Sequence, residues 1–241
     1  NVRSSLWNLA ISFATMPVID RPTFFNRLKE TCPDIWKAYT RHPFVAGLGD
    51  GTLPEASFRY YLKQDYIFLI HFSRAHALAA YKADRIEDIR DAAATVSALA
   101  DYEMKLHIDY CNEWGITETA LANTKEAPAN LAYTRFVLER GMVGDLLDLQ
   151  VVLAPCIVGY AEIGSWLIEG PLTKRRNNPY NRWIDMYSGK EYQAIGQAAI
   201  KKLDSLAVRY GGNSRFDALA ENFQIATKLE IDFWQMGLAV G

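Results

Sequence analysis

Apolar residues recur at intervals of three and four positions along most of the chain, which is the period of an amphipathic α-helix. The clearest stripe lies in a helix predicted for residues 54–83 and consists of Phe58, Tyr61, Leu62, Phe68, Leu69 and Phe72. Further helices are expected at 23–40, 86–113, 128–140, 143–169, 180–187, 190–209 and 214–238. No segment shows the two-residue alternation of a β-strand. The sequence therefore predicts an all-α fold.

Turn-forming residues separate these predicted helices. The stretch HPFVAGLGDGTLP at 42–54 holds three glycines and two prolines, so we expect a turn-rich connection with His42 as a turn residue. Thr52 and Glu55 have the spacing of a capping box at the start of the next helix. Glycines are expected to end later helices, at Gly141, Gly170-Pro171 and Gly211-Gly212.

Residues 1–21 differ from the rest because they show neither a clear period nor a charge pattern. We expect a linker or leader segment there, followed by one helical domain over residues 22–241. A cationic start followed by a long apolar block is missing, which argues against a signal peptide. The first residue is Asn rather than Met, which indicates a processed chain or a fragment.

Composition and charge exclude several classes of protein. The net charge is −2, and the only basic run, Lys174-Arg175-Arg176, falls in a predicted loop, so we expect no nucleic-acid partner. The longest apolar run, 151–161, is short of the ~20 residues that span a bilayer, so no membrane partner is expected. The cysteines, Cys32, Cys111 and Cys156, lie far apart in sequence, which indicates no metal site and a reducing, cytoplasmic setting. We also expect no cofactor.

Two acids fall on apolar helix faces. Asp65 lies seven residues from both Phe58 and Phe72, and Glu230 lies three residues before Phe233. A buried carboxylate is costly unless it is paired or used. Spacing alone leaves both roles open: a structural acid satisfied by neighbouring groups, or an acid of a functional site.

Cys156 lies on the apolar stripe of the helix predicted for 143–169, together with Tyr160 one turn later. A buried cysteine usually behaves as a small apolar side chain. However, Pro155 removes a helix hydrogen bond at a cost of about 3 kcal/mol unless it is compensated. A kinked helix with a thiol and a phenol on one inward face suggests a site without defining one.

Four blocks of the sequence together resemble the TenA/thiaminase II family. The first runs through His42-Pro43-Phe44 and Gly49 to Pro54, and ends with Tyr-Leu-x-Gln-Asp at 61–65. The second is Pro-Cys-x-x-x-Tyr-x-Glu-x-Gly at 155–164. The others are NPYNRWIDMYSGKEY at 178–192 and ENFQIATKLEIDFW at 221–234. Their order and spacing match the family over about residues 24–238.

The resemblance implies a haem-oxygenase-like helical bundle, usually assembled as a homotetramer. It also implies an aminopyrimidine aminohydrolase, which breaks the bond between an aminopyrimidine methylene and its leaving group. The implied substrates are thiamine and an aminomethyl-aminopyrimidine, between which the sequence does not choose, and the product is hydroxymethylpyrimidine for thiamine biosynthesis and salvage. In fungi such domains are fused behind a hydroxymethylpyrimidine kinase, and residues 1–21 fit the linker of such a fusion.

The family's functional residues can be carried over position by position. Its nucleophile falls on Cys156 and its acid/base on Glu230. The pyrimidine-binding acid falls on Asp65, and the pocket aromatics fall on Phe68, Tyr133, Tyr160 and Tyr187. Phe68 is a departure, because bacterial members often carry Tyr there, and we expect altered affinity rather than lost chemistry.

Two other interpretations keep the same fold. A non-catalytic pyrimidine-binding or regulatory protein would keep the pocket without turnover. A haem- or quinone-dependent enzyme would need an inward-facing histidine near the N-terminal helix, and the sequence indicates none there.

Overall fold

The computed structural model describes residues 22–240, apart from the side chains of Tyr102 and Leu106. The linker or leader predicted for residues 1–21 lies outside the described residues. Between residues 22 and 240 the chain forms helices and no strand, which confirms the all-α prediction.

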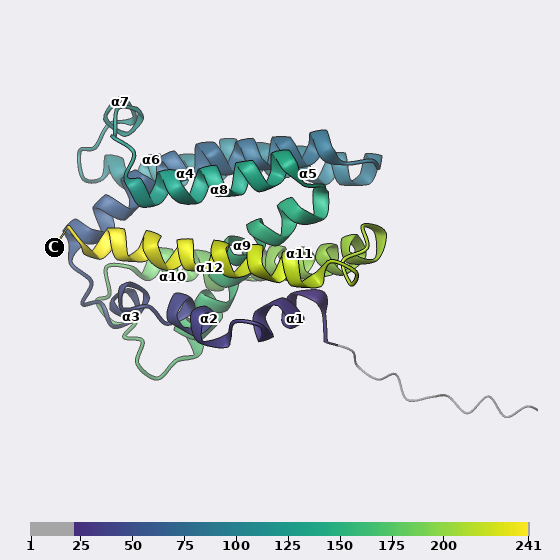
Figure 1. The fold of residues 1–241 in the computed structure, drawn as a ribbon. Coiled ribbons are helices and arrows are strands. Elements are labelled where there is room, and N and C mark those ends of the chain that lie inside the picture. Colours follow the sequence, from purple (N-terminus) through teal and green to yellow (C-terminus); the bar gives the residue numbers. More distant parts are fainter. Residues whose placement is uncertain (1–21, 241) are drawn as a thin grey trace, which may run out of the picture.

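The helices follow one another with short connections (Figure 1). The first half contains α1 (Phe24–Glu30), α2 (Pro33–Thr40), α3 (Pro43–Asp50), α4 (Glu55–Lys82), α5 (Ile86–Ala98), the π-helical turn η1 (Leu99–Glu103), α6 (Met104–Asn112) and α7 (Glu118–Ala122). The second half contains α8 (Pro128–Val143), α9 (Leu146–Glu169), α10 (Asn181–Ser188), α11 (Lys190–Arg209) and α12 (Phe216–Leu238).

The helices α9 and α12 form the centre of the bundle. α9 packs against α10, α11 and α12, and α12 also packs against α2, α4 and α8. Figure 1 shows α4, α5 and α8 along one side of this pair and α1 to α3 along the other. The apolar part of α9 extends beyond the uninterrupted run at 151–161. By length and composition alone, this helix could cross a membrane. Because 67% of its most apolar window is buried, this apolarity is that of a core helix.

Trp234 of α12 joins the helices through its aromatic neighbours. It is fully buried, and its ring stacks on Phe44 of α3 with the ring centroids 4.9 Å apart. Tyr61 of α4 and Tyr160 of α9 lie against it, each at 5.4 Å, and Tyr39 of α2 stacks at 6.5 Å. Each such pair adds about 0.5–1.5 kcal/mol beyond its buried area. One indole therefore fixes four helices relative to α12.

The bounds of most predicted helices are confirmed to within a few residues. Differences occur where a proline starts a helix or a glycine continues one. The helix expected at 23–40 is split into α1 and α2, because Pro33 begins a new helix. The helix expected at 86–113 is interrupted by η1. Gly141 does not end α8; it is buried inside the helix, where a side chain would press on Leu78 and Leu149.

The turn-rich connection predicted for 42–54 is wrong, because most of it is the helix α3. His42 caps this helix: its Nδ1 accepts a hydrogen bond from the Phe44 backbone N–H at 3.2 Å. The capping box is also wrong. Thr52 Oγ1 donates to Asp50 at 2.6 Å instead, and α4 begins after Pro54 with no side-chain cap. The short helix α7 was not predicted.

Gly164 is required where α9 meets α10. A Cβ at this position would lie 2.3 Å from the backbone oxygen of Tyr187, so α10 would have to move. We expect Gly164→Ala to lower the free energy of unfolding by about 1–3 kcal/mol, measured by urea denaturation. The exposed Glu169→Ala at the end of the same helix should change it by less than about 0.5 kcal/mol. Equal stability of the two variants would contradict this packing.

Candidate active site

The residues predicted to act on a ligand come from five helices that pack on one another at the centre of the bundle. They are Asp65 and Phe68 from α4, Tyr133 from α8, Cys156 and Tyr160 from α9, Tyr187 from α10, and Glu230 from α12. All are buried except Cys156, which keeps some accessible surface. The prediction that Asp65 and Glu230 face inward is therefore correct.

Glu230 lies in an environment that favours its protonated form. Burial raises the pKa of its carboxyl to about 8, and the negative charge of Asp65 adds to this rise. The hydroxyl of Tyr133 donates a hydrogen bond to Glu230 Oε1 at 2.7 Å, which only partly offsets the effect of burial. At neutral pH, Glu230 is therefore a carboxylic acid that can give up a proton.

Asp65 forms a buried ion pair with His107 of α6. The distance from His107 Nε2 to Asp65 Oδ2 is 2.6 Å, and His107 Nδ1 lies 3.0 Å from the backbone oxygen of Glu103. Burial alone would lower the pKa of His107, but the hydrogen bond and charge of Asp65 raise it to about 9. His107 is therefore a cation at neutral pH, and the pair keeps Asp65 ready to accept hydrogen bonds.

The tyrosines form a connected group beside Asp65. Tyr61 OH lies 3.4 Å from Asp65 Oδ2 and also 3.4 Å from Tyr160 OH. The ring of Tyr160 in turn meets the ring of Tyr187 edge to face, with the centroids 4.8 Å apart. Phenol groups in this arrangement can offer both hydrogen bonds and ring faces to a planar ligand.

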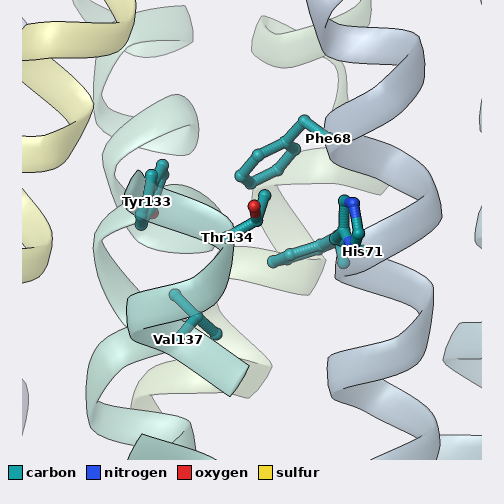
Figure 2. A pocket seen from close by; sticks show the side chains of 6 residues that line it. Phe68, His71, Tyr133, Thr134 and Val137 are labelled. Carbon is teal, nitrogen blue, oxygen red and sulfur yellow. The ribbon is translucent and has the colours of Figure 1, made fainter. Parts of the chain in front are cut away.

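Phe68 lines a small pocket between α4 and α8. Its ring lies 5.3 Å from that of Tyr133 and 5.5 Å from that of Phe233. The pocket encloses about 10 Å³, room for roughly one water molecule, and is lined by Phe68, His71, Phe72, Tyr133, Thr134 and Val137. Figure 2 shows Phe68 and His71 reaching from α4 toward Thr134 and Val137 of α8. The pocket therefore reaches Tyr133, the hydrogen-bond partner of Glu230.

Cys156 follows Pro155 on α9, and the backbone carbonyl of Pro155 accepts a hydrogen bond from the hydroxyl of Tyr39 on α2 at 3.1 Å. Burial raises the pKa of the Cys156 thiol well above its ordinary value, and the carboxyls of Glu230, Glu103 and Asp65 raise it further. The resting side chain is therefore a thiol. Part of its surface stays accessible, so a ligand in this interior could reach the sulfur.

Two further residues of this interior, Glu103 and His107, were not predicted from the sequence. They are four positions apart, so they share one face of their helix. Such a Glu-x-x-x-His pair could have drawn attention, but it lies in a segment without a strong apolar stripe. Among the described residues, no three histidine, cysteine or acidic side chains converge in the manner of metal ligands.

Comparison with known proteins shows the family of the chain. Over residues 30–239 the chain matches the TENA/THI-4/PQQC family. It is 40% identical over 213 residues to an uncharacterised protein of Haemophilus influenzae, covering 88% of this chain and 98% of that protein. It is 34% identical over 216 residues to an aminopyrimidine aminohydrolase of Halalkalibacterium halodurans, covering 89% of this chain and 95% of the relative.

A longer relative is the putative hydroxymethylpyrimidine/phosphomethylpyrimidine kinase 2 of Schizosaccharomyces pombe. It is 34% identical over 200 residues, which are 83% of this chain but only 36% of the relative. Among solved structures, a TenA family transcription regulator from Silicibacter sp. TM1040 superposes with a TM-score of 0.84 at 47% identity, covering 89% of this chain and 96% of that one. The family match over most of the sequence, the relatives and the shared fold show that the chain belongs to the TENA/THI-4/PQQC family.

Proposed function

We propose that the protein is a thiaminase II-type hydrolase, which cleaves the bond between the exocyclic methylene of an aminopyrimidine and its leaving group. The observation that carries this proposal is that the Cys156 thiol and the Glu230 carboxyl lie in one interior. Burial there keeps the carboxyl protonated at neutral pH. A relative named aminopyrimidine aminohydrolase, 34% identical over nearly its full length, supports the same reaction.

In the proposed reaction, the sulfur of Cys156 adds to the ring carbon next to the carbon that bears the methylene. The proton of the thiol passes to the adjacent ring nitrogen. The electrons of the ring then form an exocyclic double bond and expel the leaving group. An amine leaving group that is neutral when bound takes a proton from Glu230, whereas an ammonium or the thiazolium of thiamine leaves as a neutral amine or thiazole and needs none. This is covalent catalysis, which divides one difficult displacement into easier steps.

The second half of the reaction restores the enzyme. Water adds to the exocyclic methylene, and its proton goes to the carboxylate that the first half left on Glu230 or, with a cationic substrate, through Glu230 to the solvent. The carbon–sulfur bond breaks, the ring becomes aromatic again, and the ring nitrogen returns its proton to the departing sulfur. The product is hydroxymethylpyrimidine.

Other side chains hold the ring in this scheme. Asp65, fixed by His107, accepts hydrogen bonds from the amino group of the pyrimidine. Tyr160 and Tyr187 supply hydrogen bonds and a ring face, while Phe68 and Tyr133 form the opposite wall. Phe68 offers no hydroxyl, so its part of that wall is apolar.

We further propose that the enzyme acts on thiamine and on the aminomethyl-aminopyrimidine, in thiamine biosynthesis and salvage, as a cytoplasmic homotetramer. The kinase name of the fission-yeast relative supports a role beside hydroxymethylpyrimidine phosphorylation and a fusion to a kinase domain. The cytoplasmic setting is supported by the three cysteines, Cys32, Cys111 and Cys156, all of which are free.

A second candidate function is a pyrimidine-binding regulator without turnover. The name transcription regulator, carried by a 47% identical protein of the same fold, favours it. The two functions differ in one measurement: an enzyme releases hydroxymethylpyrimidine, whereas a regulator only binds it.

The nucleophile can be tested by replacing Cys156 with Ser. We expect Cys156→Ser to lose turnover of both substrates by at least about a thousandfold, because an alcohol is a far weaker nucleophile than a thiol. Binding of hydroxymethylpyrimidine should stay within about threefold of wild type. Product release is measured by chromatography, and binding by calorimetry.

Replacement of the fully buried Cys111 by Ser provides a matched control, since it changes the same atom outside the site. The folded Cys111→Ser protein should turn over both substrates with the same rate constant as wild type. A fully active Cys156→Ser protein would contradict the mechanism. A wild-type protein that binds the product but turns over neither substrate would favour the regulator.

The protonation of Glu230 can be tested through stability. Because folding raises its pKa from 4.5 to about 8, Glu230 favours the folded state most below pH 4.5, and this contribution is lost as the pH rises through 8. We therefore expect the free energy of unfolding of Glu230→Gln to rise relative to that of wild type as the pH increases from 4.5 to 8. The relative gain should be about 1.4 kcal/mol for each unit of pKa shift. Urea denaturation at several pH values measures the difference.

The solvent-exposed Glu221 lies on the same helix as Glu230 and serves as a control. Glu221→Gln should show no pH-dependent difference from wild type in this range. A difference between wild type and Glu230→Gln that is independent of pH would mean that Glu230 is ionised in the folded protein and cannot act as the proposed acid.

A further inference from the structure

Glu103 is an acidic residue beside the proposed site that the mechanism above does not use. It is the last residue of the π-helical turn η1, and π-helical turns are rare and concentrate at functional sites. It lies one turn before His107, whose Nε2 contacts Asp65 at 2.6 Å. Because residues four apart share a helix face, Glu103 and His107 both lie on the side that faces the centre of the bundle.

The carboxyl of Glu103 is enclosed and yet accessible. Burial raises its pKa to about 7. Among the described side chains, none forms a hydrogen bond or an ion pair with this carboxyl. Its oxygens are nevertheless not fully inaccessible. Glu103 therefore keeps some accessible surface, as Cys156 does.

The charge of Glu103 acts on groups around the reacting sulfur. It raises the pKa of the Cys156 thiol, second only to Glu230 among the charged neighbours. It also raises the pKa of Tyr187 and of Tyr192 from α11. In the proposed reaction the sulfur attacks the carbon beside the methylene-bearing carbon. The substituent that leaves is therefore close to the sulfur, and Glu103 is one of the carboxyls whose charge acts on that sulfur.

The described interior has more acids than cations. Asp65 is paired with His107, whose charge also lowers the pKa of Glu103, so one cation serves two acids and Glu230 has none of its own. The other titratable groups facing this space are uncharged at neutral pH: Cys156, Tyr39, Tyr61, Tyr133, Tyr160, Tyr187 and Tyr192. A buried carboxylate without a counter-ion is costly, so a ligand that brings a positive charge meets a site able to ionise and pair with it.

We propose that Glu103 is a substrate-binding residue that pairs with a positive charge on the exocyclic methylene substituent, and so selects cationic pyrimidines over the neutral hydroxymethyl product. This inference rests on the proposed function. Thiamine carries a permanent thiazolium charge, and the aminomethyl compound carries an ammonium. Hydrolysis removes that charge, which weakens the contact with Glu103 and favours release of the product.

The test compares two ligands of nearly equal shape, the aminomethyl- and the hydroxymethyl-aminopyrimidine. Their dissociation constants are measured by calorimetry on Cys156→Ser protein, which does not consume the ligand, with and without Glu103→Gln. A buried charge-assisted contact contributes about 1.5–3 kcal/mol. We therefore expect Glu103→Gln to weaken binding of the aminomethyl compound by about ten- to a hundredfold. Binding of the hydroxymethyl compound should change by less than about threefold, which also shows that the variant is folded.

Thiamine supplies a second readout because its charge does not titrate. Its affinity for the Cys156→Ser protein should rise between about pH 6 and pH 8 as Glu103 ionises. This rise should shrink when Glu103 is replaced by Gln, whereas the exposed Glu221→Gln should leave it unchanged. A merely structural role for Glu103 would not alter this pH dependence.

Three results would overturn the proposal. Equal weakening of both pyrimidines would make Glu103 a residue that holds the ring or the fold rather than the charge. Unchanged binding of both would place it outside the site. If neither pyrimidine binds and the wild-type protein releases no product from either substrate, the proposed function itself fails, and this inference fails with it.

Discussion

The structure depends on keeping charge inside an apolar helical bundle. Moving a carboxylate from water into such an interior costs several kcal/mol unless a partner or a proton compensates it. Asp65 is compensated by His107 at 2.6 Å, and the pKa of His107 is raised to about 9, so that His107 is a cation at neutral pH. Glu230 is compensated by a proton instead, with a pKa of about 8. The same fold thus prepares one carboxylate that accepts hydrogen bonds and one acid that donates a proton.

The aromatic core makes this separation geometrically stable. Trp234 lies one turn from Glu230 on α12 and contacts rings from α2, α3, α4 and α9. The helices that carry Asp65, Cys156 and Glu230 are therefore fixed to one another by close-packed rings rather than by loops. Close packing also excludes water, which strengthens every electrostatic effect in the interior. The pKa values that favour chemistry are a consequence of the packing that stabilises the fold.

The helical period correctly predicted that Asp65 and Glu230 are buried, because it fixes which face of a long helix is apolar. The roles of all seven candidate residues came from the family resemblance and remain proposals. Glu103 and His107 were missed because the helix expected at 86–113 is interrupted by a π turn, which changes the face that points inward. The helix α3 was missed because its prolines and glycines are typical of turns. In both cases tertiary packing overrides a local signal.

The state of Cys156 has a consequence for how the chemistry must begin. Reactive cysteines usually lie beside a cation that lowers their pKa, whereas Cys156 is surrounded by three carboxyls and its pKa is raised. The free protein therefore stores a thiol, which resists oxidation and adventitious reaction. A thiolate can form only when something takes the proton and adds positive charge nearby. In the proposed reaction a cationic aminopyrimidine provides both, through its ring nitrogen and its charged substituent, so that the substrate itself activates the nucleophile.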